Sequence, residues 1–194
     1  MEVRRLFVCV DPSPDAVEHL GAIVDTLAVA RANVEGHSTR LAARDRWHVT
    51  LAFLGDVRVD RIDRAADALD RAWVGTEPPS VRFAGGGTFG RGRFAILWAG
   101  LDGDVAELRA ASQAVRRELR RARLPFDPKS FRPHLTLARP GERVGPAELA
   151  EDVTTLRGYE GPLWTVTEAH LVSSALGPRP VYTVVHTART GPVL

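Results

Sequence analysis

The sequence predicts a mixed α+β fold built as an internal duplication within one domain. The order of elements is the first reason, because a strand, a long helix, a His-x-Thr strand and a further helix occur twice. The spacing is the second reason, since 42 residues separate Leu6 from His48 and 40 separate Phe94 from His134. We therefore expect a single bilobal domain over residues 1–194, with halves of approximately 1–90 and 91–194.

The first half opens with a continuously apolar strand near Leu6. Ser13-Pro14 follows as an N-cap and a proline at the first helical position, and apolar residues then recur at helical spacing. The later elements expected in this half are a loop over 36–46, a strand from His48 to Leu54, a helix from Arg58 to Trp73 and a strand from Val81 to Thr88. We interpret the run Gly85-Gly86-Gly87 as a flexible connection between the halves.

The second half repeats this order. Phe94 to Leu101 is strongly apolar and reads as a strand, and apolar residues from Val105 to Ala122 recur at helical spacing until Pro125. The remaining elements expected are a strand from His134 to Ala138, a short helix from Pro146 to about Leu156, and strands over Trp164 to Ser173 and Val181 to Thr187.

Two copies of one pattern, His48-Val49-Thr50-Leu51 and His134-Leu135-Thr136-Leu137, carry the chemistry. In a strand, the histidine and threonine of each copy share one face while the apolar residues take the other. Two half-sheets facing each other would bring the copies together, where paired imidazoles can act as acid and base on a phosphate ester. Two satisfied core histidines are the alternative. His37-Ser38-Thr39 shares the spacing but has polar neighbours, so we expect a loop there.

Three further residues near the motifs are candidates for substrate contacts: Arg132, Trp47 and Phe53. Arg132 precedes His134 by two residues and is a candidate to bind phosphate, with an exposed arginine at a strand end as the alternative. Trp47 and Phe53 are interpreted as packing residues rather than base-stacking ones. No carboxylate lies within either motif, and neither His-x-His nor His-Glu-x-x-His occurs. We therefore expect no metal site and no cofactor.

The composition sets broad limits on function. Apolar residues make up 44% of the chain and charged residues 26%, as in ordinary soluble proteins. No apolar run is long enough for a membrane span, and no secretory signal is visible, so we expect a cytoplasmic protein with no membrane partner. The single Cys9 fits a reducing compartment and is expected in the core.

Basic residues are almost all arginine: Lys129 is the one lysine among 26. Arginine suits bidentate phosphate binding, yet a compositional bias explains this usage equally well, so it does not demonstrate a nucleic-acid partner. The basic segment from Arg116 to Arg123 is interpreted as a solvated helix face interleaved with Glu118.

The motifs make the chain similar to the 2H phosphoesterase superfamily, and in particular to its RNA 2′,3′-cyclic phosphodiesterase branch, also called 2′-5′ RNA ligase. The segments that resemble this family are Arg5-Leu6-Phe7-Val8, Trp47 to Gly55, Phe94 to Gly100, Phe131 to Arg139 and Ser174 to Tyr182. The resemblance implies two pseudo-symmetric antiparallel sheets with helices on the outside and a central cleft. It also implies metal-independent opening of a 2′,3′-cyclic phosphate at an RNA 3′ end to a 2′-phosphate.

Site roles follow from the same resemblance. His48 and His134 match the catalytic histidines, Thr50 and Thr136 the phosphate-binding hydroxyls, and Arg132 a position that is often basic. With a 5′-hydroxyl in place of water, the site would join RNA ends through a 2′-5′ bond without ATP.

The sequence leaves the order of the two histidine roles and the exact substrate open. We assign His134 as base and His48 as acid, although the similarity of the halves leaves the order open. RNA 3′ ends or small cyclic nucleotides are the expected substrates of a protein expected to be monomeric. The alternatives are a phosphodiesterase acting on another cyclic-phosphate or 2′-5′ nucleotide, and a non-catalytic nucleotide- or RNA-binding module.

Overall fold

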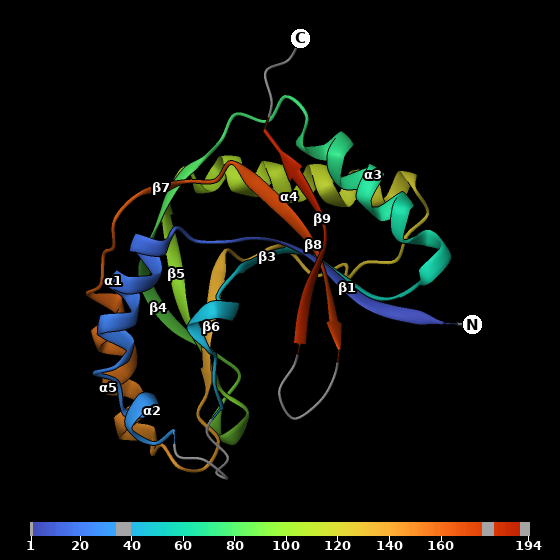
Figure 1. The fold of residues 1–194 in the computed structure, drawn as a ribbon. Helices are drawn as coiled ribbons and strands as arrows, with labels where there is room; N and C mark the ends of the chain where they lie inside the picture. The colour runs from blue at the N-terminus through green and yellow to red at the C-terminus, as the bar shows by residue number, and fades with distance from the viewer. Residues whose placement is uncertain (1, 34–39, 176–180, 191–194) are drawn as a thin grey trace.

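The computed structural model describes residues 2–33, 40–175 and 181–190. Within these ranges, strands form one curled, nine-stranded sheet in the order β7-β4-β5-β6-β3-β1-β8-β9, with β2 paired to β6 (Figure 1). Every pairing is antiparallel. The strands are β1 (Val3–Val10), β2 (Arg40–Leu41), β3 (Val49–Arg58), β4 (Ser80–Phe89), β5 (Ile96–Gly103), β6 (His134–Arg139), β7 (Trp164–Thr165), β8 (Glu168–Ala175) and β9 (Val181–Arg189).

The sheet has two similar halves that meet at its centre. One half contains β3, β1, β8 and β9, and the other contains β6, β5, β4 and β7. In both halves the His-x-Thr strand pairs with the strand that opens its copy of the repeat, so β3 lies beside β1 and β6 beside β5. The predicted α+β fold is confirmed, and the two antiparallel sheets expected from the sequence are the two halves of one continuous sheet. Each half of the sheet contains strands from both the early and the late parts of the chain.

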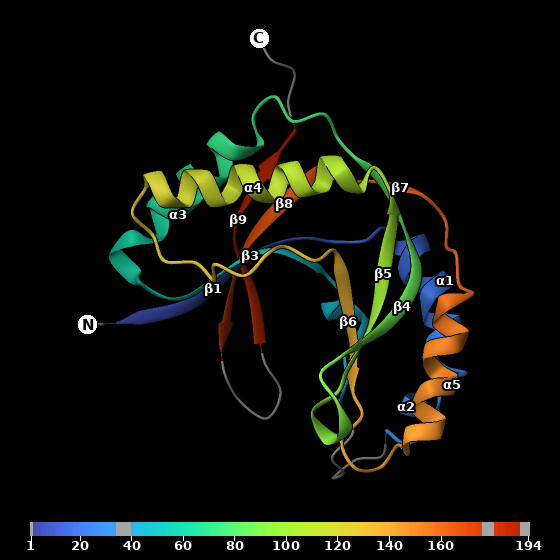
Figure 2. The same cartoon turned by 180° about the vertical axis from the view of Figure 1, so that it is seen from behind.

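The helices cover the outside of the sheet in two groups (Figure 2). The helices are α1 (Pro14–Val24), α2 (Ala28–Arg31), α3 (Ile62–Trp73), α4 (Val105–Arg121) and α5 (Pro146–Arg157), with short 3₁₀ turns at Arg44–Arg46, Val59–Arg61 and Gly92–Phe94. One group consists of α1, α2 and α5 and contacts β4, while α3 and α4 pack on each other and contact β3, β8 and β9.

The connecting helices tie the halves together. Helix α1 follows β1 in the chain but contacts β4, and α4 follows β5 but contacts β3. The buried hydroxyl of Ser112, on α4, donates a 2.7 Å hydrogen bond to the carbonyl of Leu51 on β3. Helices α1 and α4 therefore pack against the half of the sheet opposite to the strand they follow, which makes the two halves interdependent.

Local signals in the sequence account for several helix boundaries. Helix α1 begins at Pro14, and the Ser13 hydroxyl accepts a 3.2 Å hydrogen bond from the amide of Ala16, as the N-cap prediction requires. Helix α2 receives its cap from a distant residue. The carboxylate of the buried Asp152, on α5, accepts hydrogen bonds from the amides of Ala28 and Val29 at 2.7 and 3.1 Å.

Two sequence-based boundaries were wrong. The strand expected to stop at Leu54 continues to Arg58, because Gly55 has a φ of +74° and pairs with Leu6 across an irregularity in the register. The single strand expected from Trp164 to Ser173 is divided into β7 and β8. Its first part pairs with β4 and its second with β1, in opposite halves of the sheet.

The glycine run was also misinterpreted as a flexible connection. It lies within β4, where Gly86 pairs with Ala99 and Gly87 with Trp98. A Cβ atom on Gly86 would lie 2.6 Å from the Cβ of Leu156, and one on Gly87 would lie 2.7 Å from the Trp98 ring. Glycine is present because α5 and the Trp98 indole approach this strand closely.

Core residues follow the alternation expected of the strands. Cys9 is buried, as predicted, and so is Trp47, whose indole donates a 3.0 Å hydrogen bond to the carbonyl of Ala42. Phe53 is only half-buried, and the guanidinium of Arg5 lies 4.9 Å from its ring centroid. The loop expected at His37 falls outside the described residues, as do residues 176–180 of the tail. Over the described ranges, we find no helix that is both long and apolar enough to cross a membrane.

Candidate active site

The two His-x-Thr motifs lie side by side at the centre of the sheet. His48 immediately precedes β3, His134 opens β6, and the two strands meet where Val49 pairs with Leu135. Val49 and Leu135 are buried in the core, so the side chains on either side of them belong to the opposite face. We call this the motif face, defined by four half-buried side chains: His48, Thr50, His134 and Thr136.

The antiparallel register brings each histidine to the other motif's threonine. With Val49 opposite Leu135, one further step along each strand sets His48 across from Thr136 and Thr50 across from His134. The motif face therefore consists of two crossed His–Thr pairs, each drawing one residue from each half of the molecule. Each half also contributes one histidine and one threonine that share a strand face, so the motif face combines the two motifs.

Both histidines are held by the same hydrogen bond. The Nδ1 atom of His48 lies 2.8 Å from the carbonyl oxygen of Arg46, and that of His134 lies 2.6 Å from the carbonyl oxygen of Arg132. A carbonyl oxygen can only accept, so Nδ1 carries the hydrogen in both rings. Nε2 is then the basic atom of a neutral ring and a proton donor in a charged one. Each histidine thus has Nδ1 held by the backbone, and its Nε2 is the atom that could accept or donate a proton.

Aromatic side chains surround His48. The Phe7 ring stacks on the imidazole with centroids 4.9 Å apart, and Tyr182 contacts it edge-on at 5.6 Å. Burial lowers the pKa of His48 below its usual value, and the charge of His134 acts in the same direction. The Arg46 carbonyl and the Asp11 carboxylate oppose this shift. The net direction favours the neutral form of His48.

His134 has a different aromatic environment. Phe89, at the end of β4, contacts its ring edge-on with centroids 4.8 Å apart and stacks on Trp98 at 5.2 Å. Trp98 is the register partner of Thr136, so its indole lies on the motif face. The exposed guanidinium of Arg132 lies 5.8 Å from the Phe89 ring centroid. Arg132 and His134 therefore contact the same aromatic ring.

Four aromatic residues beside the motif face were not predicted from the sequence as site residues: Phe7, Phe89, Trp98 and Tyr182. They come from β1, β4, β5 and β9, so only the strand pairing brings them to the histidines. The available signal was Gly87, because a glycine opposite a tryptophan indicates that the ring lies flat across the neighbouring strand.

The other histidines of the described chain contact residues outside the two motifs. His19 contacts the Tyr159 hydroxyl at 3.0 Å, and His186 contacts Asp70 at 2.7 Å. The His170 ring contacts the hydroxyl of Thr187 at 2.9 Å. Across the described residues, no group of three or more His, Cys, Asp or Glu side chains is placed to hold a metal ion.

A curled antiparallel sheet with paired His-x-Thr motifs on its two central strands defines a 2H phosphoesterase. The family model described as the 2′-5′ RNA ligase superfamily matches residues 10–178, and the chain belongs to this superfamily.

Named relatives extend over nearly the whole chain. An RNA 2′,3′-cyclic phosphodiesterase of Methanothermobacter thermautotrophicus is 28% identical and covers 92% of this chain and 95% of its own. A second, from Archaeoglobus fulgidus, is 29% identical, with 92% and 96% covered. Since the relatives are enzymes of this family, the chain is an enzyme.

Solved structures share the fold. A Thermus thermophilus protein superposes with a TM-score of 0.71 at 26% identity, covering 95% of this chain and 97% of its own. LigT of E. coli, in a crystal structure with phosphate, gives 0.69 at 21% identity, covering 98% and 99%.

Proposed function

We propose that this enzyme hydrolyses the 2′,3′-cyclic phosphate at an RNA 3′ end to a 2′-phosphate. The observation that carries the proposal is the matched pair of histidines, each with Nδ1 bound to a carbonyl and Nε2 left for chemistry. The names of the full-length relatives, RNA 2′,3′-cyclic phosphodiesterases, support this substrate. Since the motifs contain no carboxylate or thiol ligands, the reaction is proposed to need no metal ion.

The reaction divides into two proton transfers. A neutral imidazole takes a proton from water as the water oxygen forms a bond to phosphorus. The bond from phosphorus to O3′ breaks, and a protonated imidazole donates its proton to O3′. The product has a 2′-phosphate and a free 3′-hydroxyl. The proton gained by one ring and lost by the other is exchanged with solvent before the next turnover.

We assign the base role to His48 and the acid role to His134. Burial favours the neutral form of His48, which is the form a base requires. His134 lies beside the exposed Arg132 in a more open position. This order is the reverse of the one expected from the sequence, where the similar motifs offered no distinction between the rings.

The hydroxyls and the arginine bind the phosphate in this mechanism. Thr50 and Thr136 are each set across from the opposite motif's histidine, and their hydroxyls donate to the non-bridging oxygens as negative charge develops. Arg132 supplies a positive charge at the entrance to this group. The same site accepts a 5′-hydroxyl in place of water. Its attack with loss of O3′ forms a 2′-5′ bond, and the strained cyclic ester replaces ATP as the source of free energy.

Product analysis tests the proposal. The enzyme is incubated in EDTA with a short RNA ending in a 2′,3′-cyclic phosphate, and the products are compared with 2′- and 3′-phosphate standards. We expect the 2′-phosphate alone. A 3′-phosphate product, or no turnover by a folded enzyme, would contradict the assignment. Parallel assays with 2′,3′-cyclic mononucleotides distinguish an RNA enzyme from one that acts on small nucleotides.

A further inference from the structure

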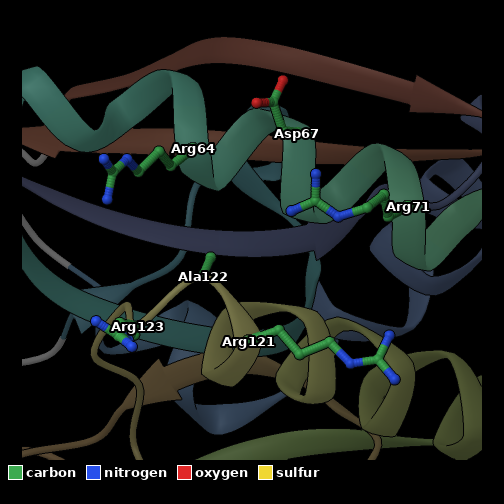
Figure 3. A pocket seen from close by; sticks show the side chains of 6 residues that line it. All are labelled: Arg64, Asp67, Arg71, Arg121, Ala122 and Arg123. Atoms are coloured by element: carbon green, nitrogen blue, oxygen red, sulfur yellow. The ribbon is translucent and has the colours of Figure 1, made fainter.

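A second basic site lies on the helical side of the molecule. Helix α3 and the end of α4 border an open pocket of about 400 Å³, which we call the arginine pocket. Its lining residues are Arg64, Asp67, Arg71, Arg121, Ala122 and Arg123. Figure 3 shows Arg64 and Arg71 on the side of α3 that faces α4, with the small Ala122 between the two helices. None of these residues belongs to the motif face.

Part of this cluster is held in place by a buried carboxylate. Glu118, on α4, was expected on a solvated face, but its side chain is only 6% exposed. Its oxygens lie 3.4 Å from Nε of Arg71 and 2.8 Å from Nη1 of Arg121, and 3.8 Å from Nε of Arg117. One buried charge thus positions three arginines, whose side chains stay 53–70% exposed. Most of their N–H groups remain available to a ligand.

Two arginines of the pocket have no such partner. Within the described residues, the side chains of Arg64 and Arg123 form no hydrogen bond or ion pair. The carboxylate of Asp67 points away from the end of α4 (Figure 3). The pocket therefore keeps a net positive charge, because Asp67 and the buried Glu118 balance only two of its four arginines.

Local structure disfavours an arginine at both of these positions. Arg64 lies in the first turn of α3, where the helix dipole repels a positive charge. Arg123 directly follows Ala122, the C-cap of α4. Its φ of +56° lies in the left-handed region that favours glycine. The amide of Leu124 donates to the Leu119 carbonyl at 3.0 Å, as in the usual glycine-ended helix. Neither arginine is therefore placed there by the preferences of the local backbone.

We propose that the arginine pocket binds the phosphate groups of an anionic ligand, separately from the motif face. Guanidinium groups on two facing helices suit bidentate contacts to more than one phosphate. The phosphates can come from an RNA backbone or from a free oligophosphate, and the chemistry of recognition is the same. Binding here does not depend on turnover at the histidines.

Titration calorimetry with inorganic tripolyphosphate tests this site. The measurements use a Thr50→Val/Thr136→Val background, which removes the hydroxyl donors of the motif face. In that background, Arg64→Ala/Arg123→Ala is compared with Arg109→Ala/Arg157→Ala, which removes two exposed arginines from elsewhere on α4 and α5. We expect the first pair to weaken binding by about tenfold or more, as the loss of one charge-assisted contact requires. The control pair should leave the affinity nearly unchanged.

A short RNA with a 3′-hydroxyl distinguishes the two sources. If the Arg64/Arg123 variant also binds this RNA more weakly than the control pair does, the ligand is an RNA backbone. If only tripolyphosphate binding changes, the ligand is a free oligophosphate. Equal affinities of the two double variants for both probes would overturn the proposal.

Arg123→Gly provides an independent test, because its two readouts move in opposite directions. Glycine relieves the left-handed conformation, so the midpoint of thermal unfolding should rise. Tripolyphosphate binding should weaken at the same time. A variant that is more stable and binds with unchanged affinity would contradict a ligand-binding role for Arg123.

Discussion

Val49 lies opposite Leu135, and among the described residues this is the one register pair that joins β3 to β6. Both side chains are buried, so the contact belongs to the core while the neighbouring residues form the motif face. This one pair brings the two motifs together, so that each histidine is set across from the other motif's threonine.

The leaving group distinguishes the two histidines. His134→Ala should lower the turnover of a cyclic phosphate by about 10²–10⁴-fold, the usual contribution of a general acid. It should have little effect on an aryl phosphodiester that releases p-nitrophenolate, because that group leaves without a proton. His48→Ala should be impaired on both substrates, since water still requires a base. The opposite pattern would exchange the two roles.

The threonine hydroxyls should affect rate more than stability. Thr50→Val and Thr136→Val keep the shape of the strand but remove a donor to the non-bridging oxygens. Each should lower kcat by up to about 10²–10³-fold, as loss of an oxyanion donor does. Thr155→Val, at an exposed position on α5, is the matched control. Steady-state kinetics that fail to separate the motif variants from this control would remove the threonines from the site.

Arg132 should bind the substrate through the negative charge of its phosphate. Replacing it with alanine should lower kcat/KM by about 10–100-fold, the equivalent of one hydrogen bond to a charged group. Arg139→Ala removes an exposed arginine from the other end of β6 and should have a small effect. Comparable kinetics of the two variants would assign Arg132 to the solvated surface.

The stability of the folded protein should depend on pH through His48. Burial lowers its pKa in the folded state, so the unfolded chain binds a proton more readily as the pH falls through 6.5. The free energy of unfolding should therefore decrease on acidification from pH 7 to 5. His48→Gln cannot take up that proton, so urea unfolding of this variant should show a smaller decrease. An identical pH dependence in both proteins would contradict a buried neutral imidazole.

The shared face of the histidine and threonine in each motif could be predicted from the sequence, because strand alternation is a local property. His48 and Thr50 had to share a face, and the two copies indicated a duplicated fold. The surroundings of the histidines depend on non-local strand pairing. Tyr182 reaches His48 from β9, and Phe89 reaches His134 from β4, along paths that no local pattern specifies.

Tertiary packing also explains the misinterpreted segments. Gly86 was interpreted as a linker residue because Leu156, whose close approach requires a glycine there, is 70 residues away in the sequence. Glu118 was interpreted as a surface residue of an amphipathic helix, but the folded chain buries it and pairs it with Arg71 of α3. In both cases the deciding neighbour belongs to another element.

The pH dependence of kcat/KM in the presence of EDTA tests the central claim most directly. One histidine must be neutral and the other protonated, so the profile on a short RNA with a 2′,3′-cyclic phosphate should be bell-shaped, with limbs that belong to the pair. His48→Ala and His134→Ala should each abolish one limb. A flat profile from about pH 5 to 9, with chemistry shown to be rate-limiting, would contradict catalysis by a histidine acid–base pair.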